Sequence, residues 1–378
     1  MKIKVSGLRI LLSLPVMLLA CGVGAVERAV PVREITPDDL PLVITNSGVY
    51  AVVADLRVEE PGDALTVEAD DVTILFEGGS LGGAGRESGV GIMQGPRYRG
   101  LTVKGGRIWG WRTGIRAAGI SNHVEATTVD SCATGIVLGA EAVVARVTVS
   151  NCFDGIEVGR RSKLAFCTVL DCSRRALAVG ADSTVGACTV YDSGDGIIAG
   201  EGTVVSQSVA YGNNGVGIRL GPSGIARTCS SYENGTGIQA EAEAVLAGNS
   251  SFQNRGDGIV AGNGVIVRGC SAAKNQGNGV VVDSRCRVLN SASMGNGQAG
   301  FLVVGTGNRI EACKAFENRI GYLVTGAGNL IIGNEAGTNR ERNYDIGMGN
   351  ISGRVCGPQE AGQAEGQPPN IEYTVSGE

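Results

Sequence analysis

A glycine followed by an apolar residue recurs along most of this chain at a nearly constant interval of about 21 residues. Apolar residues alternate after it, as Ile218 and Leu220 do after Gly217, with the alternation of a β-strand. The recurring position is occupied by Gly114, Gly135, Gly155, Ala176, Gly196, Gly217, Gly237, Gly258, Gly279, Gly300 and Gly321. Since no comparable stretch keeps the periodicity of a helix, the interval predicts a repeated unit of three short strands.

Such a unit is too small to bury its apolar residues alone, so we expect the units to stack and to pair strand on strand. Aromatic residues make up only 4% of the chain, and the core must therefore be aliphatic. The turn before each glycine favours asparagine, which tolerates left-handed backbone. One asparagine per unit predicts a ladder with a spacing of about 4.8 Å. Its expected members are Asn214, Asn234, Asn254, Asn275, Asn296 and Asn318.

Three segments carry a family resemblance: Asn-Gly-Val-Gly-Ile at 214–218, Asn-Gly-Thr-Gly-Ile at 234–238 and Gly-Asn-Leu-Ile-Ile-Gly-Asn at 328–334. They resemble repeats of the pectin-lyase-like right-handed parallel β-helix superfamily, in particular its uncharacterised secreted bacterial members. The resemblance covers about residues 66–356. It implies an all-β fold, a single-stranded right-handed parallel β-helix, or solenoid, with about eleven regular rungs. It implies little about activity, because one fold hosts many functions.

The ends of the chain differ from the repeat. Residues 1–25 have a basic start and an apolar run too short to span a bilayer, which predicts a signal peptide cleaved after Ala25 and an exported protein, periplasmic or secreted. Leu-Leu-Ala-Cys at 18–21 also resembles a lipobox, so a lipid anchor on Cys21, as in an outer-membrane lipoprotein, is the alternative. Residues 26–113 are predicted to form an N-terminal cap and irregular first rungs, 114–356 the regular β-helix, and 357–378 a polar tail.

Charge and metal-binding residue types exclude several partners. The net charge is −5 and no basic stripe is present, so we expect no nucleic-acid partner. With His123 as the only histidine and no Cys-x-x-Cys, we predict no transition-metal site and no obligatory cofactor. Asp154, Asp195 and Asp257 each begin an Asp-Gly-Ile, which leaves Ca²⁺ as an open alternative, although no dense aspartate loop is present.

Ten of the eleven cysteines remain if Cys21 is set aside, and several recur in register. Twelve residues past the repeat glycine lie Cys167, Cys188, Cys229 and Cys270, and just before it lie Cys132, Cys152 and Cys172. Small, nearly apolar thiols in such columns are typical of an interior ladder. Cysteines on adjacent rungs are close enough for a disulfide, but side-by-side stacking is poor geometry for one. We therefore predict free buried thiols, with one or two disulfides as the alternative.

A first candidate site lies directly before the repeat glycine, where Asp154, Arg175 and Asp195 occupy successive units, with Glu157 nearby. Stacking would place Arg175 between two carboxylates about 9.6 Å apart, near the separation of an inverting glycosidase pair. These three residues are the catalytic candidates and Glu157 is a candidate ligand contact. The alternative is a surface ion ladder that offsets repulsion between rungs.

A second candidate site is an aromatic column. Tyr191, Tyr211, Tyr232 and Phe252 lie fifteen residues past the repeat glycine in four successive units. Strand alternation favours an outward column, on which sugars could stack, and a structural aromatic ladder is the alternative. Trp109 is a further candidate ligand contact on the surface. Trp111, in the turn position that later holds Cys132, is expected to pack inside the N-terminal rungs.

Three hypotheses for function remain open. The motifs Asn-Thr-Asp and Gly-His-Gly of polygalacturonase-like hydrolases, and Asp-Pro-His-Glu of β-helical uronate epimerases, are missing. We therefore favour an exported protein that binds polysaccharide or another cell-envelope glycan. The alternatives are a polysaccharide lyase or glycoside hydrolase acting on acidic glycans and a purely structural surface spacer, so whether the chain is an enzyme is left undecided.

Overall fold

The computed structural model describes residues 8–9, 31–359 and 366–373. The chain divides into two compact units, residues 1–149 and 150–378. Among the described residues the only helix is a short 3-10 turn at Pro37–Asp39, so none could cross a membrane. Almost all of the predicted signal peptide, including Cys21, lies outside the described residues.

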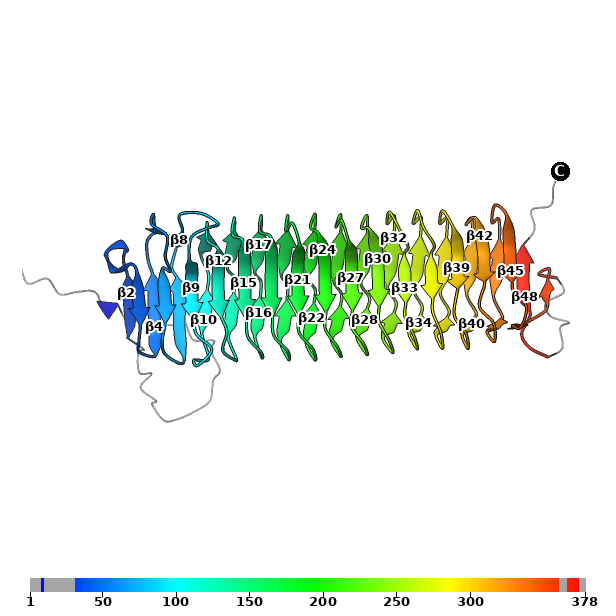
Figure 1. Ribbon diagram of the computed structural model, residues 1–378, viewed down its shortest axis with the longest axis horizontal. Coiled ribbons are helices and arrows are strands. Elements are labelled where there is room, and N and C mark those ends of the chain that lie inside the picture. Colours follow the sequence, from blue (N-terminus) through cyan, green and yellow to red (C-terminus); the bar gives the residue numbers. More distant parts are fainter. Residues whose placement is uncertain (1–7, 10–30, 360–365, 374–378) are drawn as a thin grey trace, which may run out of the picture. The chain divides into compact units, whose positions relative to one another are not determined.

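Each turn of the chain contributes one strand to each of three sheets, here A, B and C, and consecutive turns pair in parallel (Figure 1). In the first unit, sheet A contains β2 (Val32–Ile35), β4 (Gly48–Val52), β7 (Val72–Phe76), β10 (Thr102–Lys104), β13 (His123–Glu125) and β16 (Val143–Ala145). Sheet B contains β3 (Leu42–Ile44), β6 (Leu65–Val67), β9 (Val90–Gln94), β12 (Thr113–Ala117) and β15 (Thr134–Leu138). Sheet C contains β5 (Leu56–Arg57), β8 (Ser80–Gly82), β11 (Arg107–Trp109) and β14 (Thr128–Asp130). A very short strand, β1 (Leu8–Arg9), runs antiparallel to β2.

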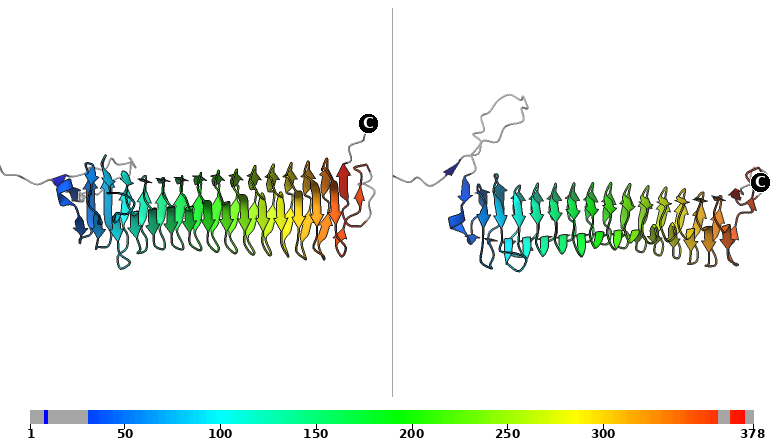
Figure 2. Two further views of the ribbon diagram at one scale, coloured as in Figure 1. Left: turned by 45° about the horizontal axis from the view of Figure 1, so that its top comes forward. Right: turned by 90° about the horizontal axis from the view of Figure 1, so that it is seen from above.

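The second unit repeats the same three-sheet turn with greater regularity (Figure 2). Sheet A contains β19 (Lys163–Ala165), β22 (Thr184–Gly186), β25 (Val204–Ser206), β28 (Ile225–Arg227), β31 (Val245–Ala247), β34 (Ile266–Arg268), β37 (Arg287–Leu289), β40 (Arg309–Glu311), β43 (Leu330–Ile332) and β46 (Ile351–Ser352). Sheet B contains β18 (Asp154–Val158), β21 (Arg175–Val179), β24 (Asp195–Ala199), β27 (Val216–Leu220), β30 (Thr236–Ala240), β33 (Ile259–Ala261), β36 (Val280–Val282), β39 (Ala299–Val303), β42 (Ile320–Val324) and β45 (Arg342–Ile346). Sheet C contains β20 (Thr168–Leu170), β23 (Thr189–Tyr191), β26 (Val209–Tyr211), β29 (Ser230–Tyr232), β32 (Ser250–Phe252), β35 (Ser271–Ala273), β38 (Ala292–Met294), β41 (Lys314–Phe316), β44 (Glu335–Gly337), β47 (Val355–Cys356) and β48 (Asn370–Tyr373), while β17 (Thr148–Ser150) lies at the unit boundary.

The chain makes about 15 turns in its described part, since sheet B has 15 strands. The all-β solenoid prediction is confirmed, and the count of about eleven regular rungs is low. Three of the additional turns lie before Gly114, and one, which contains β45, follows Gly321. Before Gly114 the step between register partners varies, from 17 residues between Val32 and Val49 to 29 residues between Thr73 and Thr102. Because the loops before Gly114 vary in length, the repeat interval cannot be recognised there in the sequence. Near the other end, residues 370–373 of the predicted polar tail form β48, which pairs with β44.

The core is a set of aliphatic columns, because alternate strand residues face inward. In sheet B of the second unit one such column is fully buried and contains Ile156, Leu177, Ile197, Ile218, Ile238, Ile259 and Val280. Near the C-terminal end of this unit the column becomes aromatic. Phe301, Tyr322 and Tyr344, here the inner ladder, stack with ring centroids 5.0 and 5.1 Å apart.

An asparagine ladder lines the corner between sheets C and B. Each member accepts a hydrogen bond from the backbone N–H of the ladder residue one turn earlier, as Asn254 Oδ1 does from Asn234 at 3.0 Å. The prediction was wrong at its first member: Asn213 is buried and bonds to Asn234 at 3.0 Å, whereas Asn214 is exposed. Counting back from the repeat glycine fails at this position because the intervening turn varies in length.

The ten cysteines in the described residues are buried and form no disulfide, as predicted. Their columns alternate with serine and asparagine, whose side chains accept neighbouring cysteine N–H groups, as Asn249 does from Cys229 at 2.9 Å. Burial is the main cause, and the neighbouring Cys152 thiol the second cause, that raises the pKa of Cys172 to about 12. Burial likewise raises the pKa of Cys313 to about 12.

These thiols should not react with a disulfide reagent at pH 8 while the protein is folded. Burial shields all ten sulfurs from the reagent, and the raised pKa of thiols such as Cys172 and Cys313 keeps their reactive thiolate scarce. Titration with 5,5′-dithiobis-(2-nitrobenzoate) should detect the ten thiols only after denaturation in guanidinium chloride. Rapid reaction of one of them in the native protein would contradict the interior columns.

Candidate functional site

The Asp154, Arg175 and Asp195 column forms in sheet B as the spacing predicts, with all three side by side in register. Its charges are distributed differently from the prediction. Asp154 is only 6% exposed. Its Oδ1 accepts hydrogen bonds from Arg175 Nε at 3.2 Å and from Arg174 Nε at 3.1 Å. Arg175 also donates to Glu157 at 3.3 Å. Asp154 is thus the buried centre of an ion cluster that includes Arg174, a residue that we did not predict.

The ion cluster limits the chemistry of Asp154. Burial by itself raises the pKa of this carboxyl, but hydrogen bonds from Arg174 and Arg175 outweigh burial and hold the pKa below its ordinary value. A general acid for glycoside cleavage needs the opposite, a carboxyl whose pKa is raised towards neutrality. Asp154 is therefore an ionised structural partner of two arginines at neutral pH.

Asp195 and Asp257 both accept hydrogen bonds from backbone N–H groups of the next turn. Asp195 Oδ1 accepts the N–H of Val216 on the next turn at 2.9 Å, and Asp257 Oδ1 accepts the N–H of Asn278 at 2.7 Å. These carboxylates satisfy backbone donors where the chain enters sheet B. Within the described residues no three histidine, cysteine, aspartate or glutamate side chains converge as metal ligands would.

The second predicted site forms an aromatic ladder on the outside of sheet C. Tyr191, Tyr211, Tyr232 and Phe252, here the outer ladder, are half-buried, while the residues preceding them face the core. Ring centroids are 4.9, 5.0 and 4.8 Å apart, and neighbouring rings are within 11° of parallel. The ring faces therefore cover one another, and a ligand can reach mainly the ring edges and the tyrosine hydroxyls.

The outer ladder is part of a longer outward column. Strand register extends it to Leu170 on one side and to Ala273, Met294 and Phe316 on the other. We call these eight residues the outer strip. Exposed acids directly follow four of them in the chain, namely Asp171, Asp192, Glu233 and Glu317. The outer strip is thus a narrow apolar band with an acidic margin.

Comparison with known proteins identifies the architecture. The family model described as right handed beta helix region matches residues 141–286 and 175–315. The A-module of mannuronan C-5 epimerase AlgE6 from Azotobacter vinelandii has a TM-score of 0.54 at 14% identity, over 86% of this chain and 91% of that module. This protein has the right-handed parallel β-helix fold.

Two further β-helix structures are more distant. The periplasmic alginate epimerase AlgG has a TM-score of 0.42 at 12% identity, covering 85% of this chain and 78% of its own. The catalytic unit of an α-1,3-glucanase from Streptomyces thermodiastaticus has a TM-score of 0.46 at 12% identity, covering 81% and 61%. No curated protein matches the sequence.

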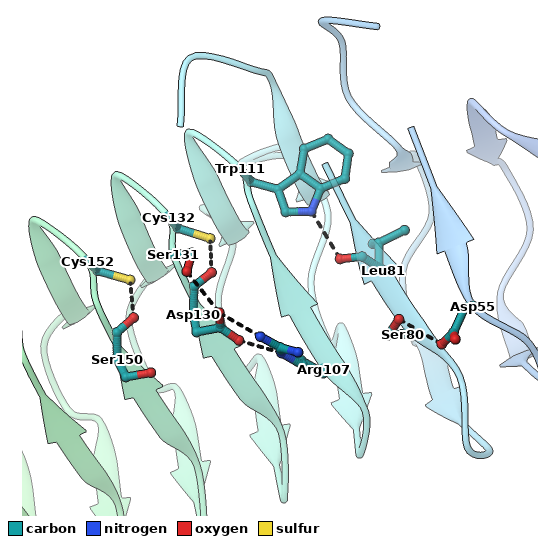
Figure 3. A network of polar contacts seen from close by, with 10 residues as sticks. All are labelled: Asp55, Ser80, Leu81, Arg107, Trp111, Asp130, Ser131, Cys132, Ser150 and Cys152. Carbon is teal, nitrogen blue, oxygen red and sulfur yellow. Dashed lines mark hydrogen bonds and ion pairs between the residues drawn. The ribbon is translucent and has the colours of Figure 1, made fainter. Parts of the chain in front are cut away.

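The remaining candidates lie in the first unit of the β-helix. Trp111 is fully buried and donates to Leu81 O at 3.2 Å, as predicted (Figure 3). Trp109 is half-buried on the outer face of sheet C, with Arg57 and Arg107 against its ring. His123 lies on the outer face of sheet A, where burial is the main cause that lowers its pKa. Arg57 was not predicted, because it precedes the regular repeat.

Asp154→Asn should lower the free energy of unfolding of the β-helix at pH 7 and should make that free energy depend less on pH in the acidic range. The folded-state pKa of Asp154 is lowered, so its stabilisation is present above the unfolded-state pKa of about 3.9 and is lost as pH falls through the folded-state value. We expect a loss of about 1–2 kcal/mol at pH 7. Denaturant unfolding of both proteins between pH 7 and pH 2 measures this difference.

Asp192→Asn is the matched control, since it removes one exposed carboxylate from the same unit. It should change the free energy of unfolding at pH 7 by less than about 0.5 kcal/mol. Equal losses in the two variants would mean that the Asp154 ion cluster contributes no more than general surface charge.

Proposed function

We propose that this protein binds an extended glycan along the outer strip of sheet C. The observation that carries the proposal is the outer ladder, whose aromatic edges face outward at the same register position on four successive turns. At a rise of about 4.8 Å per turn, the eight residues of the outer strip span about 34 Å. A linear polymer suits a long, narrow band better than a compact ligand does.

The stacked rings favour many weak contacts over one strong contact. No sugar ring can enter between rings whose centroids are 5.0 Å apart or less. Contact is therefore through ring edges and the hydroxyls of Tyr191, Tyr211 and Tyr232, for which no hydrogen bond is found among the described residues. Because contacts on one polymer add up, long chains should bind far more tightly than short oligosaccharides.

The acidic margin favours an uncharged glycan. Asp171, Asp192 and Glu233 would repel a polyuronate along the outer strip, and the chain as a whole carries a net charge of −5. The polysaccharide class itself is supported by the fold, since the A-module with the same architecture is a mannuronan epimerase by name. A lyase or hydrolase centred on Asp154 is less favoured because that carboxylate is already paired with two arginines.

Affinity electrophoresis with neutral and acidic polysaccharides tests this proposal. A neutral glucan or xylan should retard the protein, and alginate should retard it less. Tyr211→Ala should weaken the retardation, while Phe166→Ala, which removes an aromatic side chain that is 65% exposed away from the outer strip, should leave it unchanged. Retardation that is undiminished in Tyr211→Ala would place binding elsewhere, and none at all in the unaltered protein would favour a structural spacer.

We further propose that the mature protein works outside the cytoplasm. The basic start and apolar run of residues 1–25 support export to the periplasm or medium. N-terminal sequencing of the natural protein should find Val26 first. Acylation of Cys21, detected by mass spectrometry, would instead indicate an outer-membrane lipoprotein.

A further inference from the structure

The Trp109 indole lies over Gly82 in sheet C of the first unit, in the space that a larger side chain at position 82 would occupy. Strand register aligns Arg57, Gly82, Trp109 and Asp130 in one outward column. A side-chain carbon added at Gly82 would lie 2.6 Å from Cζ2 of the Trp109 indole. The indole thus occupies the space of the missing side chain and reaches towards the turn of Arg57, whose Cζ is 5.7 Å from the ring centroid.

The two arginines at this ring differ in their pairing. Arg107 donates through Nε at 2.6 Å and Nη2 at 3.1 Å to the two oxygens of Asp130, which neutralises it (Figure 3). Arg57 is exposed, and among the described residues its guanidinium has no carboxylate partner. The nearby Asp55 accepts a hydrogen bond from the Ser80 hydroxyl at 2.8 Å. A guanidinium without an ion-pair partner among the described residues therefore lies beside a half-buried indole.

We propose that Arg57 and Trp109 form a binding site for a ligand that carries a carboxylate on a saturated ring. A guanidinium offers two parallel N–H donors that match the two oxygens of a carboxylate. The indole offers an apolar surface for the C–H groups of the attached ring, and Asp130 holds Arg107 over the indole, with its Cζ 5.8 Å from the ring centroid. This site is separate from the outer strip and does not depend on the function proposed for it.

Both parts of the site are needed for selectivity. A surface arginine alone would bind any small anion weakly, and an indole alone would accept neutral sugars. Together they select a ligand whose charge and apolar surface are adjacent. The geometry also explains the glycine at position 82, because any larger residue there would displace the indole from beside Arg57.

Tryptophan fluorescence provides a direct readout, because the chain has two tryptophans and Trp111 is fully buried. Titration with glucuronate should give a saturable change, whereas glucose, which lacks the carboxylate, should give none. Cyclohexanecarboxylate distinguishes a sugar site from a general site for ring carboxylates: equal binding of both acids supports the general ligand class, and preference for glucuronate restricts it to an acidic sugar. Trp109→Phe, which keeps Trp111, should abolish the signal.

Arg57→Gln should weaken glucuronate binding at least tenfold, since it removes the cationic partner and keeps much of the length of the side chain. The control is Arg33→Gln, which removes an arginine 6.0 Å from the Tyr50 ring in the same unit and should not change affinity. Unchanged thermal unfolding would establish that each variant is folded. Equal responses to glucuronate and glucose, unchanged affinity in Arg57→Gln, or no saturable response would overturn the proposal.

Discussion

Asn254→Ala should lower the free energy of unfolding by about 2–4 kcal/mol, because it leaves the buried N–H of Asn234 without an acceptor and opens a polar cavity. In the folded protein Asn254 Oδ1 accepts that N–H at 3.0 Å. Its Nδ2 donates to Asn275 Oδ1 at 2.8 Å and to Ser251 Oγ at 3.0 Å. Asn254 is 0% exposed, so bulk solvent does not reach these contacts in the folded protein.

Urea unfolding followed by circular dichroism measures this loss, and hydrogen exchange should show faster exchange of the Asn234 amide. Asn214→Ala is the control, since Asn214 precedes a repeat glycine but is exposed. It should change stability by less than about 0.5 kcal/mol. The reverse order of effects would mean that Asn214, not Asn213, occupies the ladder.

Tyr322→Ala should cost about 3–5 kcal/mol, the usual loss for removing a large buried aromatic side chain. Tyr322 is fully buried between the rings of Phe301 and Tyr344, and its hydroxyl donates to Glu335 O at 3.3 Å. Truncation removes two ring contacts and leaves a cavity that the stacked turns on either side cannot close. Urea unfolding again provides the measurement.

Tyr211→Ala is the matched comparison, because it removes the same side chain from the outer ladder, where ring spacing is nearly identical. Its ring is half-exposed, so we expect a loss of only about 1–2 kcal/mol from ring stacking and partial burial. A loss as large as that of Tyr322→Ala would mean that the outer ladder is mainly a structural support. The small expected loss also keeps this variant folded for the binding test.

The candidate sites were predictable to different extents. Aligning Asp154 with Arg175 and Asp195 required only a constant rung length, and their strand register confirms that alignment. The burial of Asp154 and its pairing with Arg174 depend on how side chains cross between turns, which spacing does not specify. Arg57 and Trp109 approach each other across turns that differ in length from each other and from the regular repeat, so no count along the chain could align them.

The sequence by itself determined the architecture. A short, nearly constant repeat with strand-like alternation can bury its apolar residues only if its three-strand turns stack and share apolar columns. It also determined the columns of seven cysteines and of the outer aromatic rings. Only the tertiary structure decided that Asn213 joins the ladder, that the outer rings cover one another's faces, and that Asp154 is buried under two arginines. Periodicity specifies which turn and sheet a residue occupies, whereas turn length and side-chain direction are settled by packing and hydrogen bonding between turns.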